Sequence, residues 1–332
     1  MFDNKAILIT GGTGSFGQRF STYLLKNYSP KKIIIFSRDE LKQFEMQQQF
    51  TAPCMRFFIG DVRDKDRLKT AMRDVDYVVH AAALKQVPAA EYNPNECIKT
   101  NIYGAQNVID AAIDTDVSRV IALSTDKAAN PVNLYGATKL ASDKLFVAAN
   151  NMSGAKGPRF AVVRYGNVVG SRGSVVPFFH QLLSQGISKL PVTHDEMTRF
   201  WITLDEGVEF VVQNFQRMQG GEIFVPKIPS IRILDLVESI SGKREYDLVG
   251  IRPGEKLHEV MVPQEMAHHS LEFDDHYVIT PAIKFFDKTV DYFKNKLGEE
   301  GLPVEDKFEY HSGTNPHFLT VQELKMLDKV VL

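Results

Sequence analysis

Near the N-terminus a short apolar run leads directly into a glycine-rich segment, and this order restricts the fold more than any other feature. The run Lys5–Thr10 predicts a β-strand, and the pattern after residue 17 predicts a helix. Small residues between such a strand and helix let backbone N–H groups and the helix N-terminus approach a pyrophosphate. A tight turn without a ligand is the alternative. We predict a dinucleotide site formed by Gly11, Thr13, Gly14, Ser15, Phe16 and Gly17.

Short β-rich runs alternate with longer amphipathic stretches over the first half of the chain. The run Ile33–Phe36 is apolar on both faces, as a strand covered by helices on each side requires. The pattern predicts an α/β fold with a doubly wound parallel sheet, in which ligands bind beyond the carboxyl ends of the strands. We expect strands at Lys5–Thr10, Lys32–Ser37, Arg56–Gly60, Asp76–His80, Arg119–Ser124 and Phe160–Tyr165.

The regular alternation fades after about residue 170, which divides the chain into two parts. We expect residues 1–170, with contributions from about 200–225, to form the dinucleotide-binding domain. Residues 171–332 are expected to form mainly a smaller, discontinuous substrate-binding lobe. In this second part the pattern predicts a turn at 170–173, helices at Val176–Gln185, Glu206–Met218 and Val321–Asp328, a strand at Ile223–Val225, irregular chain at Leu190–Thr198 and a loop at Arg252–Lys256.

Composition excludes several classes of protein. The length of 332 residues suits one large nucleotide-binding domain and a smaller one, and a net charge of −2 gives no basic footprint for nucleic acid. No apolar run reaches the ~18 residues of a membrane span, and we find no signal-peptide pattern, so we expect a cytoplasmic protein. Cys54 and Cys97 lack the spacing of a disulfide framework or metal site, and the histidines show no ligand spacing. We therefore predict no metal.

The segment after the second predicted strand bears on the choice of cofactor. Arg38 and Lys42, close to Ser37, favour a ribose 2′-phosphate and hence NADP over NAD. Asp39 and Glu40 weaken this prediction, because they could bind ribose hydroxyl groups or be favourable charges in the first turn of a helix.

Two later segments are also expected at the cofactor. Asp61 and Val62 follow the third strand and are placed to contact adenine, although Asp61 could instead cap the next helix. Ala82 and Lys85 follow the fourth strand, and Lys85 is expected at the edge of the cofactor or of the substrate.

A tyrosine and a lysine stand one helical turn apart, at Tyr135 and Lys139, so that their side chains face the same way. The lysine charge can lower the pKa of the phenol and hold a cofactor ribose, which suits hydride transfer. An ordinary exposed helix pair is the alternative. Ser124 and Thr125 end a central strand, where a hydroxyl group can reach a substrate oxygen, and this favours the catalytic interpretation.

Asp126 and Lys127 directly follow this strand. An adjacent acid and base allow water to be eliminated as well as a hydride moved. A solvated surface ion pair is the alternative, which the expected position at the ligand-binding edge disfavours. Lys127 can accept a proton only when it is uncharged, and a reference pKa near ~10.4 means that burial, nearby positive charge or proton transfer to another group must supply that form.

These motifs resemble the extended short-chain dehydrogenases/reductases that modify nucleotide-activated sugars, over nearly the whole chain. The segments Ser124–Pro131 and Tyr135–Lys139, with Ser37–Lys42 and Arg252–Lys256, are most similar to the inverting UDP-N-acetylglucosamine 4,6-dehydratases (5-epimerising), of the soluble type that starts pseudaminic acid synthesis. Retaining sugar dehydratases typically carry Asp-Glu after the threonine. Lys127 in place of that glutamate separates the two groups.

The resemblance implies an NADP-dependent lyase that acts on UDP-N-acetylglucosamine and forms a homo-oligomer. Hydride leaves sugar C4 with the help of Tyr135 and Lys139, Lys127 removes the C5 proton, and Asp126 protonates the departing C6 hydroxyl. Hydride then returns to C6, and C5 is reprotonated from the opposite face. The implied substrate contacts are Lys85, Thr125, Asn167, Val168, Arg199, Arg252 and Glu255.

Other interpretations remain open. Arg199 could stack beside Phe200 and Trp201, and the segment from Arg252 to Glu255 could be only a turn closed by an ion pair. A UDP-sugar 4-epimerase or a retaining dehydratase could share the fold, although Lys127 argues against both. A catalytically silent NADP-sensing regulator is a third possibility, but it is expected to lack the tyrosine or its lysine.

Overall fold

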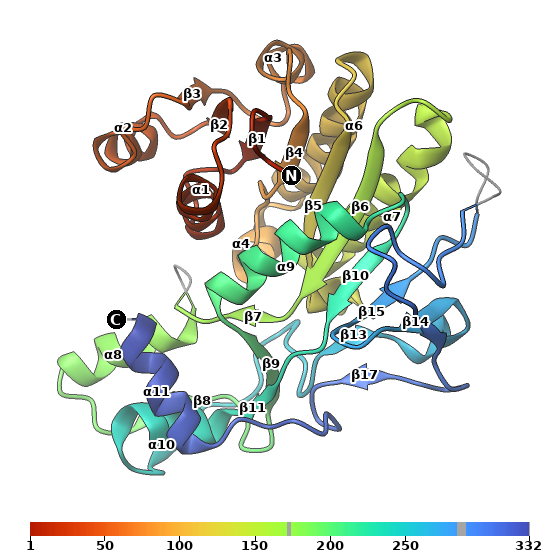
Figure 1. Cartoon of the computed structure of the whole chain (residues 1–332). Helices are drawn as coiled ribbons and strands as arrows, with labels where there is room; N and C mark the ends of the chain where they lie inside the picture. The colour runs from red at the N-terminus through yellow and green to blue at the C-terminus, as the bar shows by residue number, and fades with distance from the viewer. Residues whose placement is uncertain (171–173, 284–289, 332) are drawn as a thin grey trace.

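A large sheet runs through the computed structural model, which describes residues 1–170, 174–283 and 290–331 (Figure 1). Within these residues it has ten strands in the order β16-β14-β15-β10-β6-β5-β4-β1-β2-β3. The pairs from β3 to β10 are parallel, whereas β15, β14 and β16 are joined by antiparallel pairs. The strands are β1 (Ala6–Thr10), β2 (Lys32–Ser37), β3 (Met55–Ile59), β4 (Tyr77–His80), β5 (Arg119–Thr125), β6 (Arg159–Tyr165), β10 (Ile223–Pro226), β14 (Ser270–Glu272), β15 (His276–Ile279) and β16 (Leu302–Pro303).

Helices cover both faces of this sheet. On one face α1 packs against α9, and on the other α6 packs against α3 and α7. Every residue of β1 is buried, which explains why the central strands have no polar face. The doubly wound parallel fold predicted from the sequence is therefore confirmed. The helices around the sheet are α1 (Ser15–Asn27), α2 (Glu40–Gln49), α3 (Lys65–Ala71), α4 (Val87–Tyr92), α5 (Pro94–Ile98), the π-helix η1 (Lys99–Tyr103), α6 (Gly104–Asp114), the 3₁₀ helix η2 (Asp126–Ala128), α7 (Leu134–Ser153) and α9 (Leu204–Arg217).

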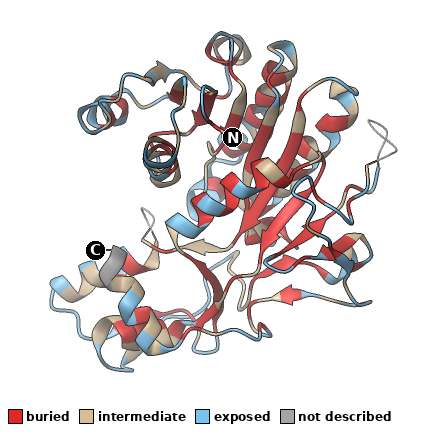
Figure 2. Cartoon of the chain, viewed as in Figure 1, coloured by how far each residue is buried: buried red, intermediate tan, exposed pale blue. Residues whose placement is uncertain are grey.

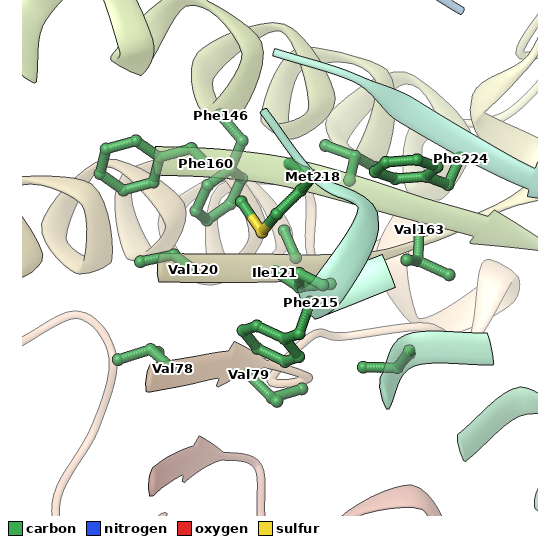
Figure 3. Packing of buried hydrophobic residues seen from close by; sticks show 14 of the residues in the cluster. Val78, Val79, Val120, Ile121, Phe146, Phe160, Val163, Phe215, Met218 and Phe224 are labelled. Carbon is green, nitrogen blue, oxygen red and sulfur yellow. The ribbon is translucent and has the colours of Figure 1, made fainter. Parts of the chain in front are cut away.

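The main hydrophobic core lies between the sheet and these helices. Figure 3 shows side chains of β4, β5, β6 and β10 packed with Phe146 of α7 and Phe215 of α9. Phe146, Phe160 and Phe215 are fully buried. Removing such a side chain costs about 3–5 kcal/mol, so this core holds the strand ends in fixed positions relative to one another.

A second core forms a small lobe away from the sheet, where α8, α10 and α11 gather (Figure 1). Figure 2 shows α10 as buried and intermediate, and α8 and α11 as mostly intermediate or exposed with a few buried positions. Trp201, Leu190 and Val237 are among the buried residues of this core. The remaining elements are β7 (Asn167–Val168), α8 (Val175–Ser184), β8 (Leu190–Val192), β9 (Thr198–Ile202), β11 (Ser230–Arg232), α10 (Ile233–Ser241), β12 (Tyr246–Leu248), β13 (Val260–Val262), the 3₁₀ helix η3 (Gln264–His269), β17 (Tyr310–His311) and α11 (Val321–Val331).

The second half of the chain differs from the sequence-based expectation in two places. The stretch 190–198, predicted to be irregular, contains β8, which pairs with β12. The strands β14, β15 and β16 extend the large sheet from a region with no clear strand pattern. These strands are too short for a periodic signal, and their pairing with one another and with β10 defines them. Of the turn predicted at 170–173, residues 171–173 lie outside the described residues. In the part of the chain that is described, no helix combines the length and apolarity that crossing a bilayer demands.

A buried ion pair joins the elements that carry the candidate catalytic residues. Asp143 of α7 accepts a hydrogen bond from Arg164 Nη2 of β6 at 3.1 Å and from Ser124 Oγ of β5 at 2.8 Å. Arg164 Nη1 also donates to the Met261 carbonyl of β13 at 2.9 Å. The side chains of Asp143 and Arg164 are only 1% and 4% exposed. Because their charges are hydrogen-bonded to each other, the pair links α7, β5, β6 and β13 without leaving a buried charge uncompensated.

Substitution of Asp143 by alanine leaves the Arg164 guanidinium buried without its counter-charge. We expect Asp143→Ala to lower the free energy of unfolding by ~3–5 kcal/mol, measured by urea denaturation. Arg19→Met removes the exposed ion pair between Arg19 and Asp205 and is the control, with an expected loss of at most ~1 kcal/mol. Equal losses in the two variants would contradict a structural role for the buried pair.

Candidate active site

A cavity of about 710 Å³ lies at the carboxyl ends of the parallel strands. Its lining comes from the segments after β1, β2, β3, β4, β5 and β6, as the doubly wound fold requires. From the predicted site it contains Gly11, Thr13, Gly14, Ser15, Phe16, Gly17, Ser37, Arg38, Asp39, Lys42, Asp61, Val62, Ala82, Lys85, Ser124, Thr125, Lys127, Tyr135, Lys139, Asn167 and Val168.

Four predicted residues do not line this cavity. Asp126 is fully buried behind it. Arg199 is 6% exposed, and its Nη2 lies 3.3 Å from Glu255 Oε1. Glu255 also accepts a hydrogen bond from the backbone N–H of Arg252, whose own side chain is exposed. Glu255 thus joins the 252–256 loop to β9 through Arg199, whereas the alternative interpretation anticipated an ion pair within the loop.

The glycine-rich turn has the close backbone packing that a dinucleotide site needs. A Cβ atom on Gly17 would lie 2.3 Å from the Gly12 carbonyl oxygen, so a larger residue would push α1 away from the turn. Gly14 is the N-cap of α1 and makes no side-chain hydrogen bond to the first helical turn. The N–H groups of that turn are therefore available to an anion, and the residues present fit a pyrophosphate.

The residues after β2 form the N-terminus of α2. Asp39 caps this helix: its Oδ1 accepts a hydrogen bond from the Lys42 backbone N–H at 3.0 Å, and its Oδ2 lies 2.7 Å from Lys42 Nζ. Arg38 is exposed at the cavity, with Nη1 3.8 Å from Asp61 Oδ2. The Asp39 carboxylate is thus occupied by its own helix, and the Arg38 guanidinium lies at the cavity beside Asp61.

Asp61 does not cap the following helix. The N-cap of α3 is Asp64, whose side chain accepts a hydrogen bond from the Arg67 backbone N–H. Asp61 Oδ2 instead accepts hydrogen bonds from Arg63 Nε at 3.0 Å and Nη2 at 2.7 Å while it lines the cavity. The helix-cap alternative for Asp61 is therefore wrong.

Tyr135 and Lys139 lie on α7 and both line the cavity. Lys139 Nζ donates a hydrogen bond to the Leu123 carbonyl at 2.8 Å, and burial lowers the pKa of this amine. Burial raises the pKa of Tyr135 to about 12, although the Lys127 charge and a hydrogen bond with Thr125 oppose the shift. The Lys127 charge therefore also acts on the phenol, an effect that the spacing of Tyr135 and Lys139 along the helix does not indicate.

Asp126 and Lys127 are not a surface ion pair. Asp126 Oδ1 accepts hydrogen bonds from Thr125 Oγ1 at 2.9 Å and from Lys127 Nζ at 3.1 Å. Asp126 Oδ2 is buried and has no hydrogen-bond partner among the described residues. Burial works to lower the pKa of Lys127, but the carboxylates of Asp126 and Glu259 outweigh it and hold that pKa above its ordinary value. Burial alone therefore does not produce the uncharged amine.

Two hydrogen bonds near the site were not anticipated from the sequence, although Lys256 belongs to the 252–256 segment that carries the resemblance. Lys256 Nζ donates to the Ala129 carbonyl at 2.7 Å, and Asn133 Nδ2 donates to the Gly254 carbonyl at 2.7 Å. These two hydrogen bonds fasten the 252–256 loop to the segment between Lys127 and α7. Asn133 also caps α7, and an asparagine shortly before a helical pattern is the signal that could have identified it.

Gly136 allows α7 to approach the backbone of Lys127. A Cβ atom at this position would lie 2.2 Å from the Lys127 carbonyl oxygen and 3.1 Å from the Lys127 carbonyl carbon. Since both groups are backbone, the clash cannot be relieved by a side-chain rotation. The glycine next to Tyr135 thus sets the distance between the tyrosine and the Asp126–Lys127 pair.

Asn167 and Asn101 have different roles. Asn167 lines the cavity, and its Oδ1 is buried with no hydrogen-bond partner in the described structure, which fits a polar ligand. Asn101 supports the backbone behind the site: its Oδ1 accepts from the Leu84 N–H at 2.8 Å and its Nδ2 donates to Thr138 Oγ1 at 3.0 Å. Among the described residues, no group of three or more His, Cys, Asp or Glu side chains could hold a metal ion.

The strand order, the glycine-rich turn and the arrangement of Thr125, Tyr135 and Lys139 define an extended short-chain dehydrogenase/reductase. A family model described as "Polysaccharide biosynthesis protein" matches residues 7–281, and the chain belongs to this family. The resemblance found in the motifs is thus confirmed at the level of the whole chain.

Relatives and solved structures agree with this assignment. The chain is 63% identical to the UDP-N-acetylglucosamine 4,6-dehydratase (inverting) of Campylobacter jejuni subsp. jejuni, over 98% of the chain and 97% of that protein. It is 40% identical to the UDP-glucose 4-epimerase of Rickettsia bellii, over 98% of the chain and 96% of that relative. The X-ray structure of Pen from Bacillus thuringiensis has a TM-score of 0.89 and 34% identity, covering 100% of both chains.

Replacement of Gly136 by alanine forces α7 and the Lys127 backbone apart. We expect Gly136→Ala to lower the free energy of unfolding by ~1–3 kcal/mol, as overpacking does elsewhere, measured by urea denaturation. Gly207, in the first turns of α9, is the matched control, because a Cβ atom there meets nothing within 4 Å. Gly207→Ala is expected to stabilise the protein by up to ~1 kcal/mol. A stable Gly136→Ala variant would show that the contact is not needed.

Proposed function

We propose that this chain is a UDP-N-acetylglucosamine 4,6-dehydratase that inverts C5. The observation that carries the proposal is Lys127, a cavity-lining amine directly after a fully buried acid. The 63% identity to an inverting dehydratase supports the same substrate and reaction. The product is a 4-keto-6-deoxy sugar nucleotide of L configuration, UDP-2-acetamido-2,6-dideoxy-β-L-arabino-hex-4-ulose, which is the first intermediate of pseudaminic acid or a related surface sugar.

Proton transfers at C4, C5 and C6 are divided among three side chains. Tyr135 takes the C4 hydroxyl proton as the 4-ketone forms. Lys127 takes the C5 proton, which the ketone has made acidic, and the C5–H electron pair forms the C5=C6 double bond. Asp126 gives its proton to the C6 oxygen, which leaves as water. Transfer of a proton from Lys127 to Asp126 over 3.1 Å supplies both starting forms.

We propose NADP as the cofactor, held at the glycine-rich turn by the N–H groups of α1. When bound, it accepts the hydride from C4 and supplies a hydride to C6. The exposed Arg38 guanidinium supports the 2′-phosphate form, as does the engagement of Asp39 by its own helix cap.

The nucleotide sugar occupies the cavity on the side of the small lobe. Asn167 offers an unsatisfied carbonyl oxygen to a sugar or uracil N–H or O–H group. The exposed Arg252 side chain is the group we assign to the diphosphate, whereas the buried Arg199 orients the 252–256 loop through Glu255 at 3.3 Å. Glu255 has its second oxygen on the Arg252 backbone, so it fixes the loop as well as accepting ribose hydroxyl groups.

The relationship to a UDP-glucose 4-epimerase favours a second candidate function on the same fold. An epimerase needs hydride transfer at C4 and no base at C5. Lys127 and the buried Asp126 have no use in that reaction, so we place the epimerase second.

We also propose a cytoplasmic homo-oligomer. UDP-sugars and NADP are water-soluble metabolites, which supports the location. Tyr92 and Tyr103, on α4 and η1, are 88% and 60% exposed, and exposed aromatic side chains are enriched at protein interfaces.

Removal of the Arg38 guanidinium tests the choice of cofactor. We expect Arg38→Ala to weaken NADP binding about tenfold or more, as loss of a charge-assisted hydrogen bond does, and NAD binding less than about threefold. Calorimetric titration of both dinucleotides measures this. Arg67→Ala, outside the cavity lining, is the control and should change neither affinity. If Arg38→Ala loses equal affinity for NADP and for NAD, Arg38 does not select the 2′-phosphate.

Incubation with UDP-N-acetylglucosamine in deuterated water tests the reaction itself. We expect NMR spectra of a 4-keto-6-deoxy product with deuterium at C5 and inverted configuration, because C5 exchanges its proton with a solvent-derived one. Retained C5 configuration would favour a retaining dehydratase, and a change at C4 alone would favour an epimerase.

The variant Lys127→Met keeps much of the side-chain volume and removes the base. It should bind the dinucleotide normally and lose dehydration by about a hundredfold or more, because general base catalysis supplies roughly 10²–10⁴-fold. Normal dehydration by this variant would eliminate Lys127 as the base.

A further inference from the structure

A second buried carboxylate contacts the Lys127 amine. Glu259 is 2% exposed, and its Oε1 lies 3.4 Å from Lys127 Nζ and 4.0 Å from Arg199 Nε. Its Oε2 has no hydrogen-bond partner among the described residues, although Lys256 Nζ is 3.8 Å away. Burial raises the pKa of the Glu259 carboxyl group, and the charges of Lys127, Arg199 and Lys256 oppose this shift and favour the anion. Lys127 is the nearest of these cations.

Two hydrogen bonds to Ser312 fix the backbone of Glu259. Its N–H donates to Ser312 Oγ at 2.9 Å, and the Ser312 N–H donates to the Glu259 carbonyl at 2.8 Å. The next residues form β13, which pairs with β17. Arg164 donates to the Met261 carbonyl of β13 at 2.9 Å and thereby joins this strand to β6. The carboxylate therefore stands on a rigid support, as a positioning group requires.

The charges around Glu259 balance within the described residues. The acids are Asp126, Glu255 and Glu259, and the bases are Lys127, Arg199 and Lys256. Besides these groups, the Tyr135 phenol also faces Lys127. Removal of the charge of Glu259, whose Oε1 lies 3.4 Å from the Lys127 amine, leaves an excess of positive charge next to Lys127, whereas Glu255 is paired with Arg199. Lys127 then loses its proton more easily.

We propose that Glu259 is a positioning residue for the dehydration: its carboxylate holds the Lys127 amine at the edge of the cavity and controls when that amine is charged. The role in catalysis rests on the proposed function, whereas the contact between the two side chains does not. In the free protein Asp126 and Glu259 together keep Lys127 as an ammonium ion.

The same contact serves the reaction. After Lys127 has passed a proton to Asp126, the neutral amine remains next to the Glu259 carboxylate, which attracts its N–H groups and leaves its lone pair for the C5 proton. The C5–H electron pair forms the C5=C6 bond, and the C6 hydroxyl leaves as water with the Asp126 proton. The ammonium formed on Lys127 then lies next to both carboxylates, and Glu259 stabilises its charge. An aspartate that orients a catalytic histidine acts in the same way.

The charge state of Lys127 can be measured without substrate. At about pH 9, acetic anhydride acylates the neutral form of a lysine, and peptide mass spectrometry reports the rate at Lys127 relative to exposed lysines. We expect Glu259→Gln to raise this relative rate about tenfold or more, because loss of a nearby opposite charge lowers a pKa by about one unit or more. A rate within about twofold of the unmodified protein would overturn the proposal.

Glu255→Gln is the matched control, since Glu255 pairs with Arg199 rather than with Lys127. It should leave the acylation rate of Lys127 within about twofold of the original. Unfolding curves and dinucleotide binding verify that each variant is folded. If Glu259→Gln does not fold, Glu259→Asp replaces it, because the shorter side chain withdraws the carboxylate and should raise the rate in the same direction.

Turnover separates this proposal from the proposed function. We expect Glu259→Leu to lower kcat about a hundredfold with KM changed less than about threefold, and Glu259→Gln, which keeps a hydrogen-bond acceptor, to recover part of that loss. Unchanged kcat in Glu259→Leu would overturn the positioning role. If the original protein does not dehydrate the sugar nucleotide but Glu259→Gln still accelerates acylation, the proposed function fails and the control of Lys127 stands.

Discussion

The buried ion pair of Asp143 and Arg164 holds the catalytic elements in register. Asp143 lies on α7, one helical turn after Lys139. It also accepts a hydrogen bond from the Ser124 hydroxyl group at the end of β5. Arg164 extends from β6 to the backbone of β13. Each of these contacts is a hydrogen bond to a charged group in a dry interior, where it is stronger than in water. The tyrosine helix, the Asp126–Lys127 turn and the strand that follows Glu259 are therefore parts of one rigid support.

Next to these elements, charged side chains lie close together around Lys127 at the edge of the cavity. Lys127 has carboxylate oxygens at 3.1 Å and 3.4 Å, both on side chains that are almost completely buried. Such a cluster stabilises the ammonium form of the free protein, yet the proposed reaction needs an amine. The conflict is resolved if the proton moves within the cluster, because exchange between Lys127 and Asp126 changes no net charge. This one proton transfer produces both the protonated Asp126 and the neutral Lys127 that the proposed elimination needs.

Much of this site could be predicted because parallel strands end at a common edge. The glycine-rich turn, Thr125 and Tyr135 each follow a strand or open a helix, so local patterns place them at the cavity. Glu259 could not be found in this way, since it precedes a three-residue strand whose partner, β17, is far along the chain. The effect of Lys127 on Tyr135 was missed for a related reason. It depends on the approach of α7 that Gly136 allows, and spacing along the chain does not reveal that distance.

The two hydrogen bonds between Glu259 and Ser312 can form only late in the synthesis of the chain. Lys127 leaves the ribosome long before Ser312 does, and at about 5–20 residues per second the delay is roughly ten to forty seconds. During this interval the nascent chain can form the parallel sheet and its glycine-rich turn, but β13 has no β17 to pair with. The amine then lacks its second carboxylate and remains hydrated. The edge of the sheet that carries the glycine-rich turn can thus form before the charge cluster around Lys127 is complete.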